Sequence, residues 1–217
     1  MKLLKTGIAG LDEFLQGGLP PRVLLLPGTP DSGNEVFARQ VAFTRANQGK
    51  ITYFTVNEAS EFVREDMASY GWDITPLEAS DNWRFKNLKK TGPTFVDTVA
   101  AEMEERRSIV VDSLSELLLA HKIDELVNLL TTMSRQNREC QEYHLLLLTE
   151  GMHDQHAETT LQHFAEGVIV FTSSLVADST QRHVIIKKMR GTLVPTRRLP
   201  YSIGRRGFVI ETAIRIS

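Results

Sequence analysis

The stretch Gly28-Thr29-Pro30-Asp31-Ser32-Gly33-Asn34-Glu35 decides how this chain folds. It keeps the glycine spacing of a phosphate-binding loop, whose working pattern is G-x-x-x-x-G-K-[ST]. Asn34 stands at the lysine position of that pattern, and Glu35 stands at the Ser/Thr position. Asp31 stands where many such loops carry glycine. The stretch therefore has the frame of a phosphate site without the residues that hold phosphate.

The residues on either side support the loop assignment. Residues 23–26 form a short apolar run of the kind that a buried parallel strand shows, and apolar residues follow Gly33 at helical spacing. Strand, glycine-bounded loop and helix is the context that the motif requires. On these residues alone, an ordinary strand-to-helix turn that happens to hold two glycines remains an alternative.

Strand and helix patterns alternate along the rest of the chain. Strands are predicted over residues 23–26, 51–56, 108–111, 144–148 and 168–171, and helices over 34–47, 61–69, 95–105 and 123–138. This alternation predicts an α/β fold with a mainly parallel central sheet flanked by helices. Residues 183–189, 201–203 and 208–211 are expected to add antiparallel strands, with turns at Gly191 and at 205–207. We expect a single domain over residues 1–217.

The composition is that of an ordinary globular chain. The 217 residues are 41% hydrophobic and 24% charged. No apolar run approaches the roughly 20 residues that span a bilayer, and the first residues break at Gly7 too early for a signal peptide. Cys140 is the single cysteine, so an internal disulfide is excluded. We therefore expect a cytoplasmic protein with no membrane partner.

The charge is unevenly distributed. Residues 179–210 carry a charge of +8 with no Asp or Glu, whereas the other 185 residues sum to −10. A basic sector on an acidic body suggests an anionic partner, such as a nucleotide, a nucleic acid or an acidic face of another subunit. The alternative is a solvated hairpin surface.

Six segments, in order, resemble the KaiC-like branch of the RecA superfamily of P-loop ATPases. Residues 6–20 are similar to that branch's opening, TGIPGLDELLGGGLP, and residues 58–73 to the segment that runs from its catalytic acidic pair to F-G-W-D. The others are 109–114 (its Walker B strand), 161–169 (L-x-x-x-A-D-G-V-I), 187–192 (K-x-R-G-[TS]) and 200–203 (P-[FY]-x-I). The match covers nearly the whole chain and implies a RecA-like fold.

The resemblance also implies which residues would form a nucleotide site. The nucleotide-binding positions of the degenerate loop are Gly28, Asp31, Ser32, Gly33, Asn34 and Glu35. In working members the loop lysine neutralises phosphate charge and the Ser/Thr hydroxyl binds Mg²⁺. Relative to G-x-x-G-x-G-K-T, this loop has shifted by three charge units toward negative. We therefore expect no cofactor beyond weak binding of ATP with Mg²⁺, and ATPase activity that is absent or weak.

The other catalytic positions are partly kept. The resemblance places Asp112 at the Walker B position, where it would contact Mg²⁺ directly or through water. It places Asn57 and Glu58 where working members have two glutamates, so only Glu58 remains at the general-base position. We expect no separate metal site. A carboxylate at a helix N-terminus is stabilising, and our hypothesis is that Asp31 or Glu35 replaces phosphate in the loop.

The subunit-facing half of the site looks intact in the sequence. In KaiC-like hexamers the K-x-R strand reaches the γ-phosphate bound by the neighbouring subunit, and the resemblance places Lys188 and Arg190 there. Alternation along a strand would put both on one face. The expected partners are further copies of this chain or an ATP-competent relative in a mixed ring. The alternative is that this strand persists because it packs.

The sequence therefore favours an inactivated KaiC-like homologue that acts by protein association in regulation or signalling. One alternative is a weak or non-standard ATPase that still uses Glu58 and Asp112. Another is a nucleic-acid-binding module that uses the basic sector. DNA strand exchange is not favoured, because residues 150–160, which follow the 144–148 strand, contain no Lys or Arg and phosphate binding needs positive charge.

Overall fold

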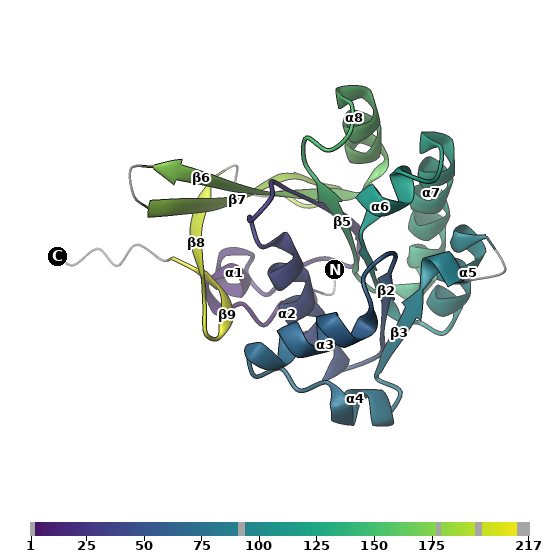
Figure 1. Cartoon of the computed structure of the whole chain (residues 1–217), viewed down its shortest axis with the longest axis horizontal. Helices are drawn as coiled ribbons and strands as arrows, with labels where there is room; N and C mark the ends of the chain where they lie inside the picture. Colours follow the sequence, from purple (N-terminus) through teal and green to yellow (C-terminus); the bar gives the residue numbers. More distant parts are fainter. Residues whose placement is uncertain (1–2, 91–93, 177–178, 194–196, 212–217) are drawn as a thin grey trace.

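A nine-stranded sheet runs through the molecule (Figure 1). The computed structural model describes residues 3–90, 94–176, 179–193 and 197–211. Within these ranges the strand order is β3-β2-β4-β5-β1-β6-β7-β8-β9. The six strands from β3 to β6 in that order are parallel, and β7, β8 and β9 extend the sheet as antiparallel strands. The predicted α/β class, with a parallel core and antiparallel C-terminal strands, is confirmed.

The strands and helices have the following bounds. The strands are β1 Val23–Gly28, β2 Ile51–Thr55, β3 Trp83–Asn87, β4 Ser108–Asp112, β5 His144–Thr149, β6 Gly167–Val176, β7 Ser179–Met189, β8 Leu199–Gly204 and β9 Gly207–Ile210. The helices are α1 Ala9–Phe14, α2 Asn34–Ala46, α3 Ser60–Ser69, α4 Thr75–Ala79, α5 Phe95–Glu104, α6 Leu114–Leu118, α7 Ile123–Cys140 and α8 Gln155–Phe164, with a 3₁₀ turn at Leu88–Lys90.

Most predicted elements appear close to their expected bounds, and the missed ones have weak patterns. β3 is an edge strand whose residues after Trp83 are only half-buried, so it shows no long apolar run. The helix α8 buries only Ala157 and Leu161, and its start is fixed by Asp154, whose side chain accepts a hydrogen bond from the Ala157 N–H at 2.8 Å. Because so few of its residues are buried, this helix shows little apolar periodicity in the sequence. Its start is set by the capping side chain instead.

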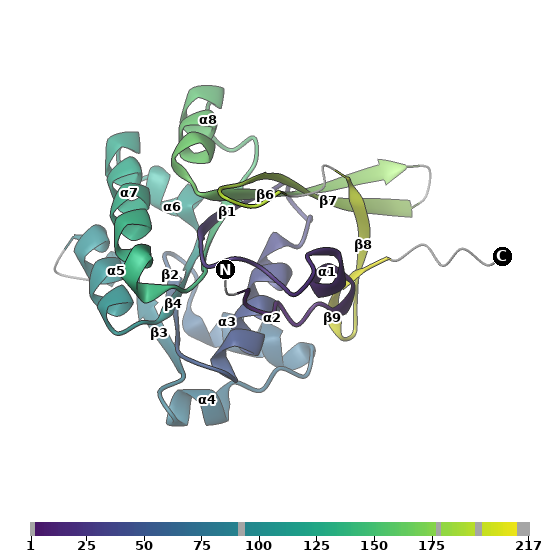
Figure 2. The ribbon, with the colours of Figure 1, turned by 180° about the vertical axis from the view of Figure 1, so that it is seen from behind.

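Helices cover both faces of the parallel part of the sheet (Figures 1 and 2). One apolar cluster joins the sheet to α1, α2 and α3, and a second joins it to α5, α6, α7 and α8. Alternation along β1 divides its side chains, since Leu24 and Leu26 belong to the first cluster and Val23 and Leu25 to the second. All six residues of β1 are buried, which fixes the loop that follows on a rigid strand.

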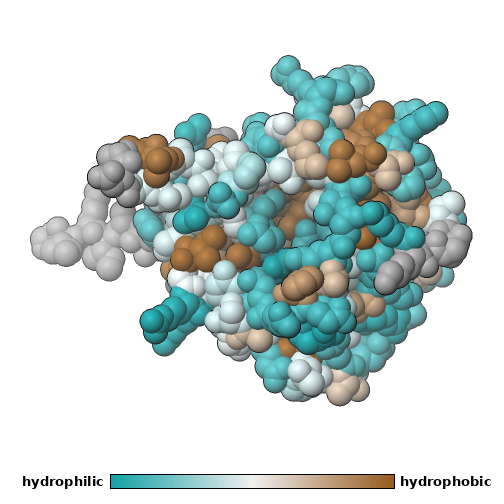
Figure 3. All heavy atoms as spheres, viewed as in Figure 1, coloured by the Kyte–Doolittle hydropathy of each residue, from teal (hydrophilic) through white to brown (hydrophobic). Residues whose placement is uncertain are grey.

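The β6–β7 hairpin extends beyond the helical layers (Figure 1). Leu175 is 77% exposed near its tip, and Figure 3 shows apolar surface beside the grey atoms there. The strand β9 packs against α1 and α2, and Tyr201 of β8 is bonded to the loop that follows β1. None of the helices in the described ranges is long and apolar enough to cross a membrane.

Candidate functional site

The loop of residues 28–35 lies at the carboxyl ends of the parallel strands. β1 ends at Gly28 and α2 begins at Asn34, so the strand, loop and helix predicted from the sequence are all present. Gly33 precedes the helix with φ 75°, a left-handed conformation that glycine adopts without strain. The neighbouring strand β5 lies between β1 and β4, which ends at Asp112. The loop and Asp112 are thus brought to the same edge of the sheet.

The interior of the loop is filled by its own side chains. A Cβ atom on Gly28 would overlap the Ser32 hydroxyl and lie 2.6 Å from Asn34 Cγ, so both side chains sit directly over this glycine. Asn34 Nδ2 also donates a hydrogen bond to the Leu26 carbonyl at 2.9 Å. Ser32 Oγ is buried and has no hydrogen-bond partner among the described residues. The Asn34 amide therefore holds the loop closed, and the Ser32 hydroxyl fills space beside it.

The hypothesis that a carboxylate replaces phosphate in the loop is wrong for Asp31. The Glu35 carboxylate accepts a hydrogen bond from its own backbone N–H in the first turn of α2, so for Glu35 the hypothesis stays a prediction. Asp31 is exposed, and φ is 61° at this position, so its side chain points away from the loop interior. Glu35 lies one helical turn before Arg39 and faces the acidic groups at the end of β4. The sequence argument considered charge at the helix N-terminus. It missed the uncharged Asn34, whose amide can satisfy a strand carbonyl at no cost in buried charge.

The C-terminal strands tie down the outside of the loop. Tyr201 in β8 donates a hydrogen bond from its hydroxyl to the Ser32 carbonyl. Arg182 in β7 donates to the Asp31 carbonyl at 3.1 Å, and the Ser173 N–H of β6 donates to Thr29 Oγ1 at 3.0 Å. Two carbonyls and one hydroxyl of the loop are thus bonded to three strands, which tie the loop to the sheet.

A buried arginine occupies the space between the loop helix and the acidic positions. Arg39 in α2 contacts Asp66 at 2.6 Å, Glu58 at 3.1 Å and Asp112 at 3.4 Å, while its own side chain is only 7% exposed. Its Nε also donates to the Tyr53 hydroxyl at 3.3 Å. Burial works against the charge, but the Tyr53 oxygen and the surrounding carboxylates raise the pKa of Arg39 above its ordinary value. The guanidinium is therefore a permanent charge in this site.

The structure therefore brings Glu58 and Asp112 close together, and Arg39 lies between them and bonds both carboxylates. Asp112 also accepts a hydrogen bond from Tyr53 at 2.6 Å, so one of its oxygens is shared by two donors. The expected second acidic position, Asn57, is exposed, and its backbone N–H donates to Glu116 at 2.9 Å. Sequence reasoning did not identify Arg39, although an arginine within the apolar face of a helix was a usable signal.

Burial raises the pKa of two glutamates in this site. For Glu35, desolvation is the main cause, its own backbone N–H and Arg39 oppose the shift, and Asp112 and Asp66 add to it. For Glu58, desolvation again leads, Arg39 opposes it, and Asp112, Asp66 and Glu116 add to it. Both shifts thus follow mainly from burial, and the neighbouring carboxylates add to them.

A shallow cavity of about 260 Å³ opens over this site. Its charged lining consists of Arg39 and four acidic residues, Glu35, Glu58, Asp112 and Glu116. A triphosphate brought to this cavity would meet acidic side chains and the closed loop. No lysine is among its lining residues. The residues present therefore do not fit ATP with Mg²⁺.

The two K-x-R residues lie at the opposite edge of the sheet. Met189, the last residue of β7, pairs with Gly167, which in turn pairs with Leu24 near the start of β1. Lys188 Nζ donates to the carbonyls of Gln162, His163 and Ala165 at 3.1, 2.7 and 2.7 Å, which uses all three of its donors at the end of α8. These hydrogen bonds make it less favourable for Lys188 to contact a nucleotide bound by a neighbouring subunit.

Arg190 lies just beyond the end of β7 and has an exposed side chain. It lines a surface cavity of about 500 Å³ together with Arg138, His163 and Glu166. Because this cavity is at the amino edge of the sheet, Arg190 is remote from the loop of its own chain. The action of Lys188 and Arg190 on a neighbour's nucleotide stays a prediction.

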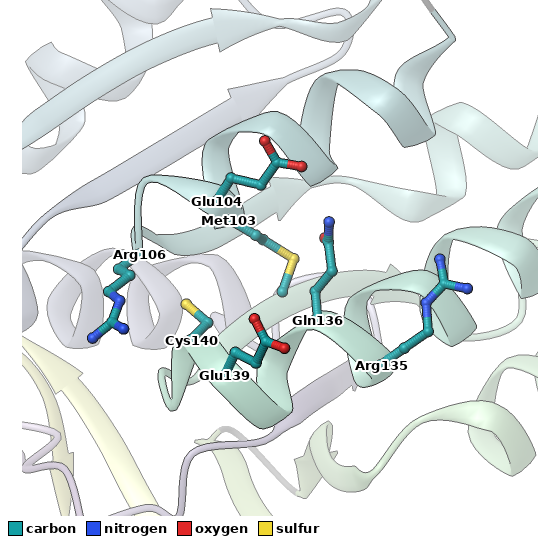
Figure 4. A pocket seen from close by; sticks show the side chains of 7 residues that line it. All are labelled: Met103, Glu104, Arg106, Arg135, Gln136, Glu139 and Cys140. Carbon is teal, nitrogen blue, oxygen red and sulfur yellow. The ribbon is translucent and has the colours of Figure 1, made fainter.

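A larger cavity of about 540 Å³ lies between α5 and α7 and has no part in this site (Figure 4). Cys140 lines it near Glu139 and Met103. Burial, reinforced by Glu142, raises the pKa of the Cys140 thiol to about 11, so this sulfur is protonated and unreactive at neutral pH. The cavity offers no evident nucleophile.

The fold and the loop define a RecA-like P-loop protein: strand, glycine-bounded loop and helix, with the Asp112 strand one position away across β5. A model of the family described as "ATPase: KaiC" matches residues 4–214. The chain belongs to this KaiC-like ATPase family, as the resemblance indicated.

Curated relatives and a solved structure are consistent with this family. A UPF0273 protein of Pyrococcus horikoshii is 25% identical, over 95% of this chain and 93% of the relative. The circadian clock protein KaiC3 of Synechocystis is 26% identical over 95% of this chain, but only 45% of KaiC3 is covered. A crystal structure of a KaiC-like protein from Pyrococcus horikoshii has a TM-score of 0.80, with 24% identity and coverage of 97% and 99%. The last comparison supports the fold.

Proposed function

We propose that this chain is a KaiC-like domain that works without nucleotide, through association with further KaiC-like domains. One observation carries the proposal: Asn34 and Ser32 occupy the interior of the loop, and Asn34 is bonded to the carbonyl of Leu26. A loop whose own side chains satisfy its strand has no vacancy for a β-phosphate. Opening it would break that hydrogen bond, at about 0.5–1.5 kcal/mol, before any phosphate contact forms.

Electrostatics support the same proposal. The lysine that would neutralise phosphate is Asn34, and the Mg²⁺-binding hydroxyl is replaced by the Glu35 carboxylate. Two like charges at ~4 Å repel by ~4 kcal/mol at an effective dielectric near 20. Solvent at this shallow site reduces that figure, yet the sign is unfavourable for every acidic residue that lines the cavity.

The basic sector, residues 179–210, supports association as the mode of action. Its exposed cations include Lys187, Arg190, Arg197, Arg198, Arg205 and Arg206, and none of them takes part in an ion pair within the described ranges. The rest of the chain is acidic. A basic surface and an acidic body on one molecule favour head-to-tail contact between copies, or contact with an acidic face of a relative.

Sedimentation velocity tests this proposal. We expect assembly that is the same with and without ATP and MgCl₂, weakens between 50 and 300 mM salt, and is reduced in the Arg205→Glu, Arg206→Glu double variant. The matched control is Lys5→Glu with Lys89→Glu, two exposed lysines outside the basic sector. A chain that assembles only when ATP is present, or that stays monomeric at every concentration, contradicts the proposal.

A further inference from the structure

We propose that Arg39 is a built-in cation that takes the place of a metal ion in this site and neutralises its acidic residues. The inference deepens the proposed function, on which it rests, because it names the group that now neutralises the acidic positions. Asp112 stands where the RecA-like fold holds Mg²⁺, and its carboxylate is bonded to Arg39 and Tyr53.

The contacts of Arg39 come from three different segments. Asp66 lies on α3, Glu58 lies in the turn before α3, and Asp112 ends β4, while Arg39 itself projects from α2. A single guanidinium thus joins the loop helix to two neighbouring strand ends. A metal ion performs the same task when it collects carboxylates from separate elements. The planar five-donor fork of arginine suits this role, because it can bond several carboxylates at once.

The carboxylates are arranged for a guanidinium. They surround its two terminal nitrogens at 2.6–3.4 Å, and within the described part of the chain no three acidic or other metal-ligating side chains converge as a metal site. Mg²⁺ usually keeps several of its waters, so a hydrated ion spans a comparable distance between carboxylates. Removal of the guanidinium would leave Glu58, Asp66 and Asp112 unbalanced beside Glu35, a group that a hydrated divalent cation can neutralise.

A second buried arginine on the same helix provides the matched control. Arg45 bonds Glu142 through two parallel contacts at 2.7 and 2.6 Å, and both side chains are about as buried as Arg39. Arg45 is thus partnered by one carboxylate, whereas Arg39 is surrounded by three. Loss of Arg45 leaves a lone carboxylate, which is a poor site for Mg²⁺.

The test compares thermal unfolding of Arg39→Gln, Arg45→Gln and the unchanged protein in 0–20 mM MgCl₂, repeated with MnCl₂. Both variants should unfold at lower temperature, by about 6–20 °C, since each breaks a buried ion pair. We expect cations to raise the midpoint of Arg39→Gln by about 5–10 °C when they reach about 100 times their dissociation constant. The unchanged protein and Arg45→Gln should respond by no more than about 1 °C, which is the specific part of the result.

An Arg39→Gln midpoint that ignores both cations, or one that shifts no more than that of Arg45→Gln, overturns the proposal. If Arg39→Gln does not fold, Arg39→Lys replaces it, because an ammonium keeps one charge but cannot bond three carboxylates and Tyr53 together. Arg39→Lys should then show a smaller cation-dependent rise, and the absence of any rise overturns the inference. Either negative result leaves the nucleotide-free function standing, since that function depends on ATP binding by the unchanged chain.

Discussion

Arg39 Nη2 lies 3.4 Å from Oδ2 of Asp112, and the same oxygen accepts a hydrogen bond from Tyr53 at 2.6 Å. Asp112, which the resemblance assigns to the Walker B position, is therefore bonded to two donors of its own chain. Asn34 does the same for the loop, through its bond to the Leu26 carbonyl. Two independent contacts thus fill the two halves of the site, and one of them uses Asn34, which stands at the lysine position of the working loop pattern.

Replacement of Ser32 by alanine should stabilise the protein or leave it unchanged. Ser32 Oγ is buried with no partner among the described residues, and an unsatisfied buried hydroxyl costs about 1–3 kcal/mol. Thermal unfolding should give a midpoint equal to or above that of the unchanged protein. Ser115→Ala is the control, because Ser115 Oγ accepts the Thr149 N–H at 2.8 Å and its loss should lower the midpoint. A large destabilisation by Ser32→Ala would show that the hydroxyl has a bonded role.

Replacement of Glu35 by glutamine should raise stability at neutral pH. Burial raises the pKa of Glu35 from 4.5, so the native state keeps this proton to higher pH than the unfolded state does. The stability that this group contributes is full below about pH 4.5 and is lost as the pH rises through the raised native pKa. Denaturant unfolding from pH 4 to 8 should show an advantage of Glu35→Gln that grows with pH. Glu65→Gln, which removes an exposed carboxylate of α3, is the control, and an advantage that shrinks with pH contradicts this account.

Replacement of Lys188 should affect mainly stability, whereas replacement of Arg190 should affect mainly assembly. Lys188→Met removes three hydrogen bonds to the end of α8, so it should lower stability by about 1–3 kcal/mol in denaturant unfolding. Arg190→Ala removes an exposed side chain and should change stability by less than about 0.5 kcal/mol while it weakens assembly in sedimentation. If Lys188→Met leaves stability unchanged, its three carbonyl bonds do not form in solution, and a role in trans becomes open to it again.

The fold could be predicted from the sequence because its parallel strands are continuous apolar runs. Residues 23–26 and 144–148 could be recognised as strands without knowing their neighbours in the sheet. Both faces of each strand are buried, so each reads as a continuous apolar run. The edge strand Trp83–Asn87 escaped detection because only its first residue is fully buried. The short helix Thr75–Ala79 has no fully buried residue, so no apolar pattern marks it in the sequence.

The sequence indicated which residues lie near one another in the site, but it did not indicate the hydrogen bonds and ion pairs that they make. The family resemblance put Asp112 and Glu58 in one site with the loop, and in the structure these residues line one cavity, while their roles stay predictions. Sequence could not show that Arg39 reaches across to Asp66 and Asp112, because that contact depends on the packing of α2 against α3 and β4. Nor could it show the internal bonds of Lys188, which depend on where α8 ends against the sheet.

Isothermal titration calorimetry of the unchanged protein with ATP and excess MgCl₂ tests the central claim most directly. The loop closed by Asn34 and the acidic lining predict no saturable heat up to about 1 mM ATP, which corresponds to a binding free energy weaker than about −4 kcal/mol. A KaiC-like relative that carries the full G-x-x-x-x-G-K-[ST] loop is the positive control. Saturable binding with a micromolar dissociation constant would contradict the account, and turnover lost in Asp112→Ala would then identify the chain as a working ATPase.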